Sequence, residues 1–170
     1  MPQTCHEPSN LYLVCMAEIN HDHFMNLALK EAARAYEEGE VPIGAIIVMN
    51  EKIIARGYNQ VEKLTDPTAH AEMIALTSAF DYLGAKYLPE AKLYVTIEPC
   101  LMCAGALYWS KIGTVVYGSA DVKNGYNKWL NSSSMYDSKN KSLHPKTMIL
   151  SGIKEKECVT LMQNFFKERR

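Results

Sequence analysis

The sequence predicts an α/β fold, a three-layer α-β-α sandwich in which helices cover both faces of a central mixed sheet of about five strands. Two observations predict this fold class. Stretches with apolar side chains at helical spacing alternate with short β-branched runs along the chain. The length of 170 residues suits one domain with a sizeable core and is short for two.

The first elements are a helix and a hairpin. From Asp22 onward, apolar and small side chains recur at helical spacing, and Gly39 stands where a C-terminal cap is expected. The segments 41–50 (VPIGAIIVMN) and 52–59 (KIIARGYN) are rich in β-branched residues and meet at an Asn-Glu turn. They predict two paired strands.

The later elements alternate between helix and strand. A helix is predicted over 68–84, where Gly84 ends the apolar face, and another over 99–110, where Pro99 suits the first turn. Further strands are predicted at 92–98, 113–118 and 147–153, and a terminal helix at 154–170. Residues 119–146 are polar and without a clear period, which predicts a long surface excursion.

Composition narrows the class of protein. Apolar residues make up 48%, and no apolar run approaches the ~20 residues of a membrane helix, so no membrane partner is expected. Five cysteines in one close pair and three scattered positions do not form a disulfide framework, which favours the reducing cytoplasm. Net charge is only −1, although the C-terminal third is basic. Residues 1–20 are interpreted as a poorly structured extension with Met16 as a possible natural start, and 21–170 as the domain.

A metal site is predicted from two helix starts. Cys100 and Cys103 lie three apart at one of them, where the helix dipole favours thiolates, and His70 lies at the other. Two thiolates and one imidazole suit Zn²⁺, and three protein ligands leave a position for water. A redox CxxC pair and an ordinary helix-start histidine are the alternatives.

Glu72 is the candidate proton carrier. Residues two apart on a regular helix lie about 200° apart, so Glu72 and His70 share a site only if His70 leaves the helix end sideways. The carboxylate would then carry a proton between water and substrate. The alternative is an ordinary charged residue on a helix.

The pattern H-x-E followed by P-C-x-x-C is the signature of zinc nucleobase deaminases, which have the cytidine deaminase-like fold. Several segments resemble the bacterial tRNA-specific adenosine deaminases over a span from about His23 to the C-terminus. These segments are VPIGAIIV (41–48), GYN (57–59), DPTAHAEMIAL (66–76), LYVTIEPCLMCAGAL (93–107), KIGTVVYG (111–118), DVKNG (121–125) and FFKERR (165–170).

The resemblance implies a hydrolase that uses one Zn²⁺ per chain to convert adenosine into inosine at the wobble position of a tRNA anticodon loop. It assigns zinc to His70, Cys100 and Cys103 and proton transfer to Glu72. It also implies a cytoplasmic homodimer whose partner is the anticodon stem-loop. Substrate contacts are assigned to Asn59, Ala71 and Asp121.

The chain departs from the family after Gly125, where a short small-residue turn is usual. Its longer excursion mixes lysines with Tyr126, Trp129 and Tyr136, a pattern that suits an unpaired RNA loop. A solvated loop with its rings turned inward is the alternative.

Two other functions fit the same residues. One is a deaminase of a free base or nucleoside, such as cytosine, guanine or cytidine, because the zinc chemistry does not depend on what carries the amine. The other is a non-catalytic zinc module that binds RNA. This second function requires a fourth protein ligand, and His144 and Cys158 are the candidates.

Overall fold

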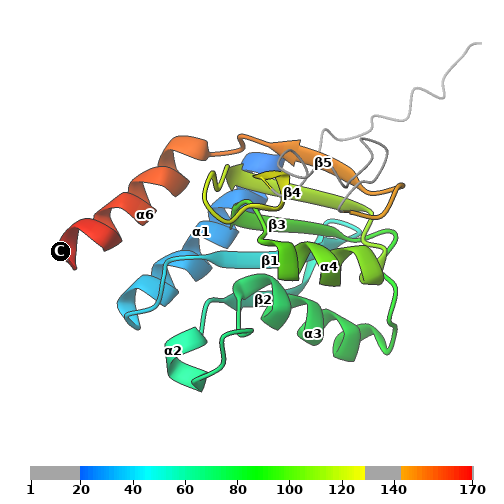
Figure 1. Ribbon diagram of the computed structural model, residues 1–170. Coiled ribbons are helices and arrows are strands. Elements are labelled where there is room, and N and C mark those ends of the chain that lie inside the picture. The colour runs from blue at the N-terminus through cyan, green and yellow to red at the C-terminus, as the bar shows by residue number, and fades with distance from the viewer. Residues whose placement is uncertain (1–19, 129–142, 170) are drawn as a thin grey trace, which may run out of the picture.

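A computed structural model describes residues 20–128 and 143–169. Five strands form one mixed sheet in the order β2-β1-β3-β4-β5, and helices cover both faces (Figure 1). The predicted three-layer α/β fold is therefore confirmed. Among the described residues, no helix is both long and apolar enough to cross a membrane.

The hairpin forms where the sequence predicted it. β1 (Gly44–Met49) and β2 (Lys52–Tyr58) pair in antiparallel register. The turn residues Asn50 and Glu51 both have positive φ, at 50° and 59°, as the twist of a two-residue hairpin loop requires. The two strands therefore continue directly into one another across a tight turn.

Strand directions decide where the loops gather. β1 is antiparallel to β3 (Lys92–Ile97), which is parallel to β4 (Thr114–Ser119), and β4 is parallel to β5 (Met148–Ser151). β2, β3 and β4 therefore all end at the same edge of the sheet. In open α/β sheets this edge is where ligands bind.

Each face of the sheet carries two of the longer helices (Figure 1). α1 (His21–Glu37) and α6 (Glu155–Glu168) lie on one face, and their core includes the side chains of Phe24, Met25 and Cys158. α3 (Ala71–Leu83) and α4 (Leu101–Ser110) cover the other face. The two cores lie on opposite sides of β1, β3 and β4.

The structure differs from the sequence prediction in the loop after β2 and at two helix starts. A four-residue helix, α2 (Val61–Leu64), lies in the loop after β2, where no helix was predicted. α3 begins at Ala71 rather than at 68, because His70 has an extended backbone with φ −71° and ψ 155°. α4 begins at Leu101 rather than at 99, because its N-cap Cys100 has an extended backbone, so Pro99 precedes the helix instead of lying in its first turn. All three differences lie next to the site described below.

The beginning of the 119–146 excursion packs against the domain. Cys100 and Gly125 form an isolated antiparallel bridge, and the Tyr126 side chain is only 2% exposed within the core. The interpretation of Tyr126 as a base-stacking ring is therefore wrong. Trp129 and Tyr136 lie outside the described residues, as do Met16 and the proposed extension up to residue 19.

Candidate active site

The site lies at the edge where three strands end. Asn59 follows β2, Cys100 comes three residues after the end of β3, and Asp121 comes two residues after the end of β4. Because these strands point the same way in one sheet, segments that are far apart in sequence meet at this edge.

Two helices begin at this edge, each after an unusual N-cap residue. His70 precedes α3 and Cys100 precedes α4, both with extended backbones, and neither side chain accepts a capping hydrogen bond. Ser, Thr, Asp or Asn would ordinarily fill such positions and bond the first turn. The imidazole and the thiol are instead turned toward each other.

Three potential ligand atoms converge here. His70 Nδ1 lies 3.6 Å from Cys100 Sγ and 3.5 Å from Cys103 Sγ. The ligand atoms of these three residues all lie within 4.8 Å of one another, and no other group of this kind occurs among the described residues. One imidazole and two thiols form a borderline-soft donor set that fits zinc.

Neither candidate fourth ligand belongs to this group. Cys158 packs in the core of the α1–α6 face, and the ring of His144 lies 5.9 Å from that of Tyr108 near the end of α4. Three ligands with space for a water molecule characterise catalytic rather than structural zinc. This geometry argues against the non-catalytic zinc module.

The hydrogen bonds around Cys100 and Cys103 favour a thiolate at one of the two cysteines even without a cation. A hydrogen bond from Cys103 and a second from His70 lower the pKa of Cys100 to about 4. The pKa of Cys103 is raised, because it donates to Cys100 and is buried. Both thiols are free rather than joined in a disulfide. Ligand donation therefore requires loss of the Cys103 proton, which a bound metal cation promotes.

Glu72 is buried beside these ligands, with only 2% of its surface exposed. Its Oε2 atom has no hydrogen-bond partner in the part of the chain that the structure describes. Burial is the main reason that the pKa of Glu72 rises to about 7. A buried carboxylate oxygen without a partner beside a metal-binding triad is suited to exchange protons with a ligand.

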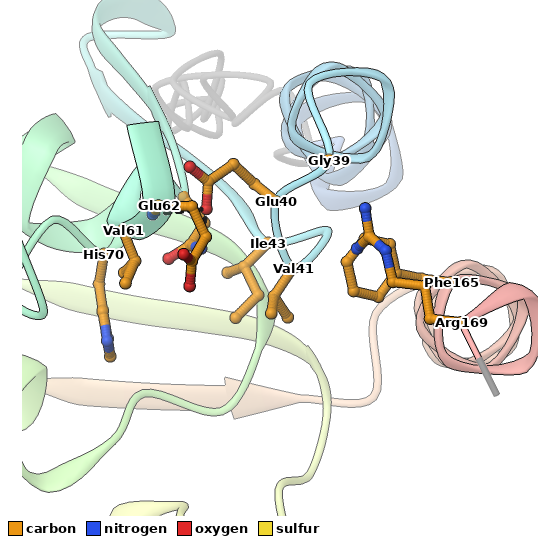
Figure 2. A pocket seen from close by; sticks show the side chains of 10 residues that line it. Gly39, Glu40, Val41, Ile43, Val61, Glu62, His70, Phe165 and Arg169 are labelled. Carbon is orange, nitrogen blue, oxygen red and sulfur yellow. Dashed lines mark hydrogen bonds between the residues drawn. The ribbon is translucent and has the colours of Figure 1, made fainter. Parts of the chain in front are cut away.

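A cavity opens onto this cluster. It has a volume of about 620 Å³ and is lined by His70, Glu72 and Cys100, by residues 119–124 after β4, and by Met162 and Phe166 of α6. A second cavity of about 490 Å³ shares His70, and its lining also includes Asn59. Figure 2 shows His70, Glu40 and Phe165 of α6 around this cavity. Both volumes are large enough for a ligand the size of a nucleobase.

Of the other predicted residues, Asn59 and Asp121 line these cavities, whereas Ala71 does not. Asn59 is 4% exposed and lines the second cavity, and Ala71 is fully buried at the first position of α3. Asp121 lines the first cavity, and its Oδ1 accepts hydrogen bonds from the backbone N–H groups of Lys123 and Asn124. The Asp121 carboxylate therefore stabilises the turn of its own loop.

Two buried carboxylates were missed by sequence reasoning. Glu40 accepts hydrogen bonds from Asn59 Nδ2 and from two backbone N–H groups of α2. Glu98 accepts from the backbone N–H groups of Asp121 and Asn127. The one sequence signal is an acidic residue close to an apolar, β-branched stretch: Glu98 directly follows β3, and Glu40 lies four residues before β1. Both tie down loops that line the site.

The sequence of this chain is similar to a known protein family and to known enzymes. A family model described as the cytidine and deoxycytidylate deaminase zinc-binding region matches residues 18–119. The tRNA-specific adenosine deaminase of Agrobacterium fabrum is 42% identical over 148 residues, which cover 87% of this chain and 95% of that protein.

Solved structures agree with these matches. One comes from a study of A-to-I editing by tRNA:A34 deaminases at the wobble position of transfer RNA. It has 42% identity and a TM-score of 0.73, covering 82% of this chain and 98% of that one. Guanine deaminase from Bacillus subtilis has 33% identity and a TM-score of 0.60, covering 72% of this chain and 82% of that one.

Proposed function

Because this chain belongs to the zinc-binding deaminase family and, within it, to the tRNA-specific adenosine deaminases, we propose that it converts adenosine to inosine at the wobble position of a tRNA anticodon. The reaction is hydrolytic: water adds its oxygen to C6 of adenine, the C6–N6 bond breaks, and ammonia leaves. The enzyme uses zinc as its cofactor.

The observation that carries the proposal is the buried Oε2 of Glu72, which has no hydrogen-bond partner within residues 20–128 and 143–169 and lies beside three convergent ligand atoms. We assign the metal to His70, Cys100 and Cys103. When bound there, zinc would acidify a water molecule enough to make it a nucleophile near neutral pH. Glu72, with a pKa of about 7, would carry a proton first to the ring nitrogen and then to the departing amine.

Substrate contacts are assigned to Asn59 and Asp121 in the walls of the two cavities and to Ala71 next to the ligand residue His70. The amide of Asn59 offers two donors and one acceptor to the base. Ala71 offers backbone atoms at the start of α3, and Asp121 borders the cavity from the loop after β4. An anticodon loop presents an unpaired base to these walls, so extrusion of the adenosine costs little.

We further propose that the partner is the anticodon stem-loop and that the protein acts as a cytoplasmic homodimer of domains spanning 21–170. An exposed apolar surface on α4 supports the dimer: Leu101 is 50% exposed, Tyr108 37% and Trp109 75%. Large exposed apolar side chains grouped on one helix are typical of protein interfaces. The free thiols among the described residues fit a reducing compartment.

The test is incubation of zinc-loaded protein with an anticodon stem-loop that carries adenosine at the wobble position. Cytosine, guanine and free adenosine are assayed in parallel. We expect inosine in the stem-loop and little turnover of the small molecules. Consumption of a free base with no inosine in the RNA would overturn the proposal in favour of the small-molecule deaminase.

A further inference from the structure

Glu40 is a buried carboxylate with no ion-pair partner among the described residues. Only 2% of its surface is exposed, in the segment between α1 and β1. Three N–H groups surround it. Oε1 accepts from the backbone of Lys63 at 2.7 Å, and Oε2 accepts from the backbone of Glu62 at 3.2 Å and from Asn59 Nδ2 at 3.1 Å. Among the described residues its charge is therefore compensated by N–H dipoles alone. Burial of a charge without an ion-pair partner costs free energy, so such a residue suggests a specific role.

A carboxylate can only accept hydrogen bonds from these partners, and this decides how the Asn59 amide is turned. If Oδ1 faced Glu40, two acceptor oxygens would meet in a buried place and one hydrogen bond would be lost. The Nδ2 end must therefore face Glu40. Within the part of the chain that the structure describes, Oδ1 and the second hydrogen on Nδ2 have no other hydrogen-bond partner and remain for the base.

The backbone of Asn59 is fixed as well. Its N–H group donates to Ile43 O at 3.0 Å, on the same segment that carries Glu40. Asn59 lines one cavity together with Glu40 and His70, and Figure 2 shows the last two. The asparagine is thus held at both its backbone and its side chain at the edge of the metal site.

We propose that Glu40 is a positioning residue, which fixes the orientation of the Asn59 amide so that Oδ1 and one Nδ2 hydrogen are presented to the base. This inference rests on the proposed function and deepens it. Glu40 selects the base indirectly, because a reversed amide would offer the opposite pattern of donor and acceptor.

The test is a double-mutant cycle of Glu40→Gln and Asn59→Ala, read as kcat/KM for inosine formation in the stem-loop. Glu40→Gln keeps the size of the side chain and permits the reversed amide. We expect it to lower kcat/KM about tenfold in the wild-type background, and less than about twofold when Asn59 is already alanine. Zinc content should be unchanged in both variants.

Glu38→Gln is the matched control. Glu38 also binds Lys63, through Nζ at 2.9 Å, and it accepts from the Tyr58 hydroxyl. Its hydrogen-bond partners among the described residues do not include Asn59. We expect its kcat/KM to stay within about twofold of wild type. Glu40→Asp, which keeps the charge and shortens the reach, replaces Glu40→Gln if that variant does not fold, with the same expectation in both backgrounds.

The outcomes separate the two proposals. Equal losses from the Glu40 substitution in both backgrounds, or no loss in either, would overturn the positioning role while leaving the deaminase activity established. A wild-type protein that forms no inosine overturns the proposed function and this inference together.

Discussion

His70 and Cys100 occupy positions where a polar side chain ordinarily caps a helix, and neither makes a capping bond. Their side chains converge with that of Cys103, so a cation bound there would connect the first turns of α3 and α4. The two helices cover one face of the sheet, and Cys103 adds a ligand from within α4. A metal bound by these residues would therefore stabilise the packing of α3 beside α4 in addition to its role in the chemistry.

Zinc removal should consequently lower the melting temperature of the protein. A ligand that binds only the folded state stabilises it by about 2.7 kcal/mol at a hundredfold excess over its Kd. We expect a zinc-dependent rise in melting temperature, measured by calorimetry in a zinc titration of the metal-free protein. Cys103→Ser should abolish this dependence, whereas Cys158→Ala should retain it because Cys158 lies in the other core.

Glu72→Gln should separate metal binding from catalysis. General acid–base groups contribute about 10²–10⁴-fold to rate, so kcat for inosine formation should fall by that factor. Zinc content, measured by atomic emission, should stay at one per chain, since the carboxylate is not among the three ligands. A variant that loses zinc together with activity would contradict the assignment of Glu72 as proton carrier.

The residues with metal chemistry could be predicted from sequence, because their spacing is itself the signal. The H-x-E and C-x-x-C patterns restrict which side chains can meet at a helix start. Glu40 and Glu98 could not be found this way. Both are common residue types, and their role depends on burial and on N–H donors from segments about 20 to 30 positions away.

At the scale of elements, the segment after β4 is fastened to the metal-binding segment. The N–H group of Tyr126 donates to Pro99 O at 3.0 Å, and Gly125 forms a bridge with Cys100. Glu98 accepts two backbone N–H groups from the same segment. The loop that carries Asp121 is therefore held in a fixed relation to the ligand Cys100.

Gly125→Ala should disturb this loop without removing the metal. An added Cβ would lie 2.5 Å from both Asp121 O and Glu98 Cδ, so the loop would have to move. Overpacking typically costs about 1–3 kcal/mol, and if this cost falls on the active conformation of the loop, kcat/KM should fall about 5- to 150-fold while zinc content stays full.

Gly105→Ala is the control for this change, measured in the same oligomeric state. An added Cβ at Gly105 meets nothing within 4 Å, and alanine favours the helix. Activity of Gly125→Ala equal to that of this control would show that the loop does not contribute to the site.

Most elements could be predicted because hydrophobic periodicity and glycine caps are local signals. α2 was missed because four residues are too few to show a period, and its first turn is held by Glu40 rather than by a capping residue of its own. The ring of Tyr126 was misjudged for a similar reason. Its polar neighbours suggested solvent, whereas the packing of its segment beneath Cys100 buries it.

On the scale of the whole molecule, strand order is the property that composition and periodicity left open. β1 lies between β2 and β3, and the three parallel strands follow on one side. Pairing between segments far apart in sequence decides this arrangement. The mixed character of the sheet and its strand number of about five were predicted from the alternating pattern and the family resemblance.

Trp109→Ser should weaken self-association if α4 forms the dimer interface. Truncation of a central aromatic side chain at an interface typically costs 2 kcal/mol or more, which raises the dissociation constant by about thirtyfold. Sedimentation velocity over a concentration series would measure this change. Tyr82→Ser is the matched control, because Tyr82 is 69% exposed on α3 and outside the α4 surface.

The position of α6 has a consequence for the order in which the protein becomes functional. All three ligands and Glu72 precede residue 104, but Met162 and Phe166 close one wall of their cavity. Ribosomes build chains from the N-terminus, so the residues of the metal site are synthesised before the cavity wall that α6 contributes. A chain terminated before α6 would contain the residues of the metal site and lack this wall.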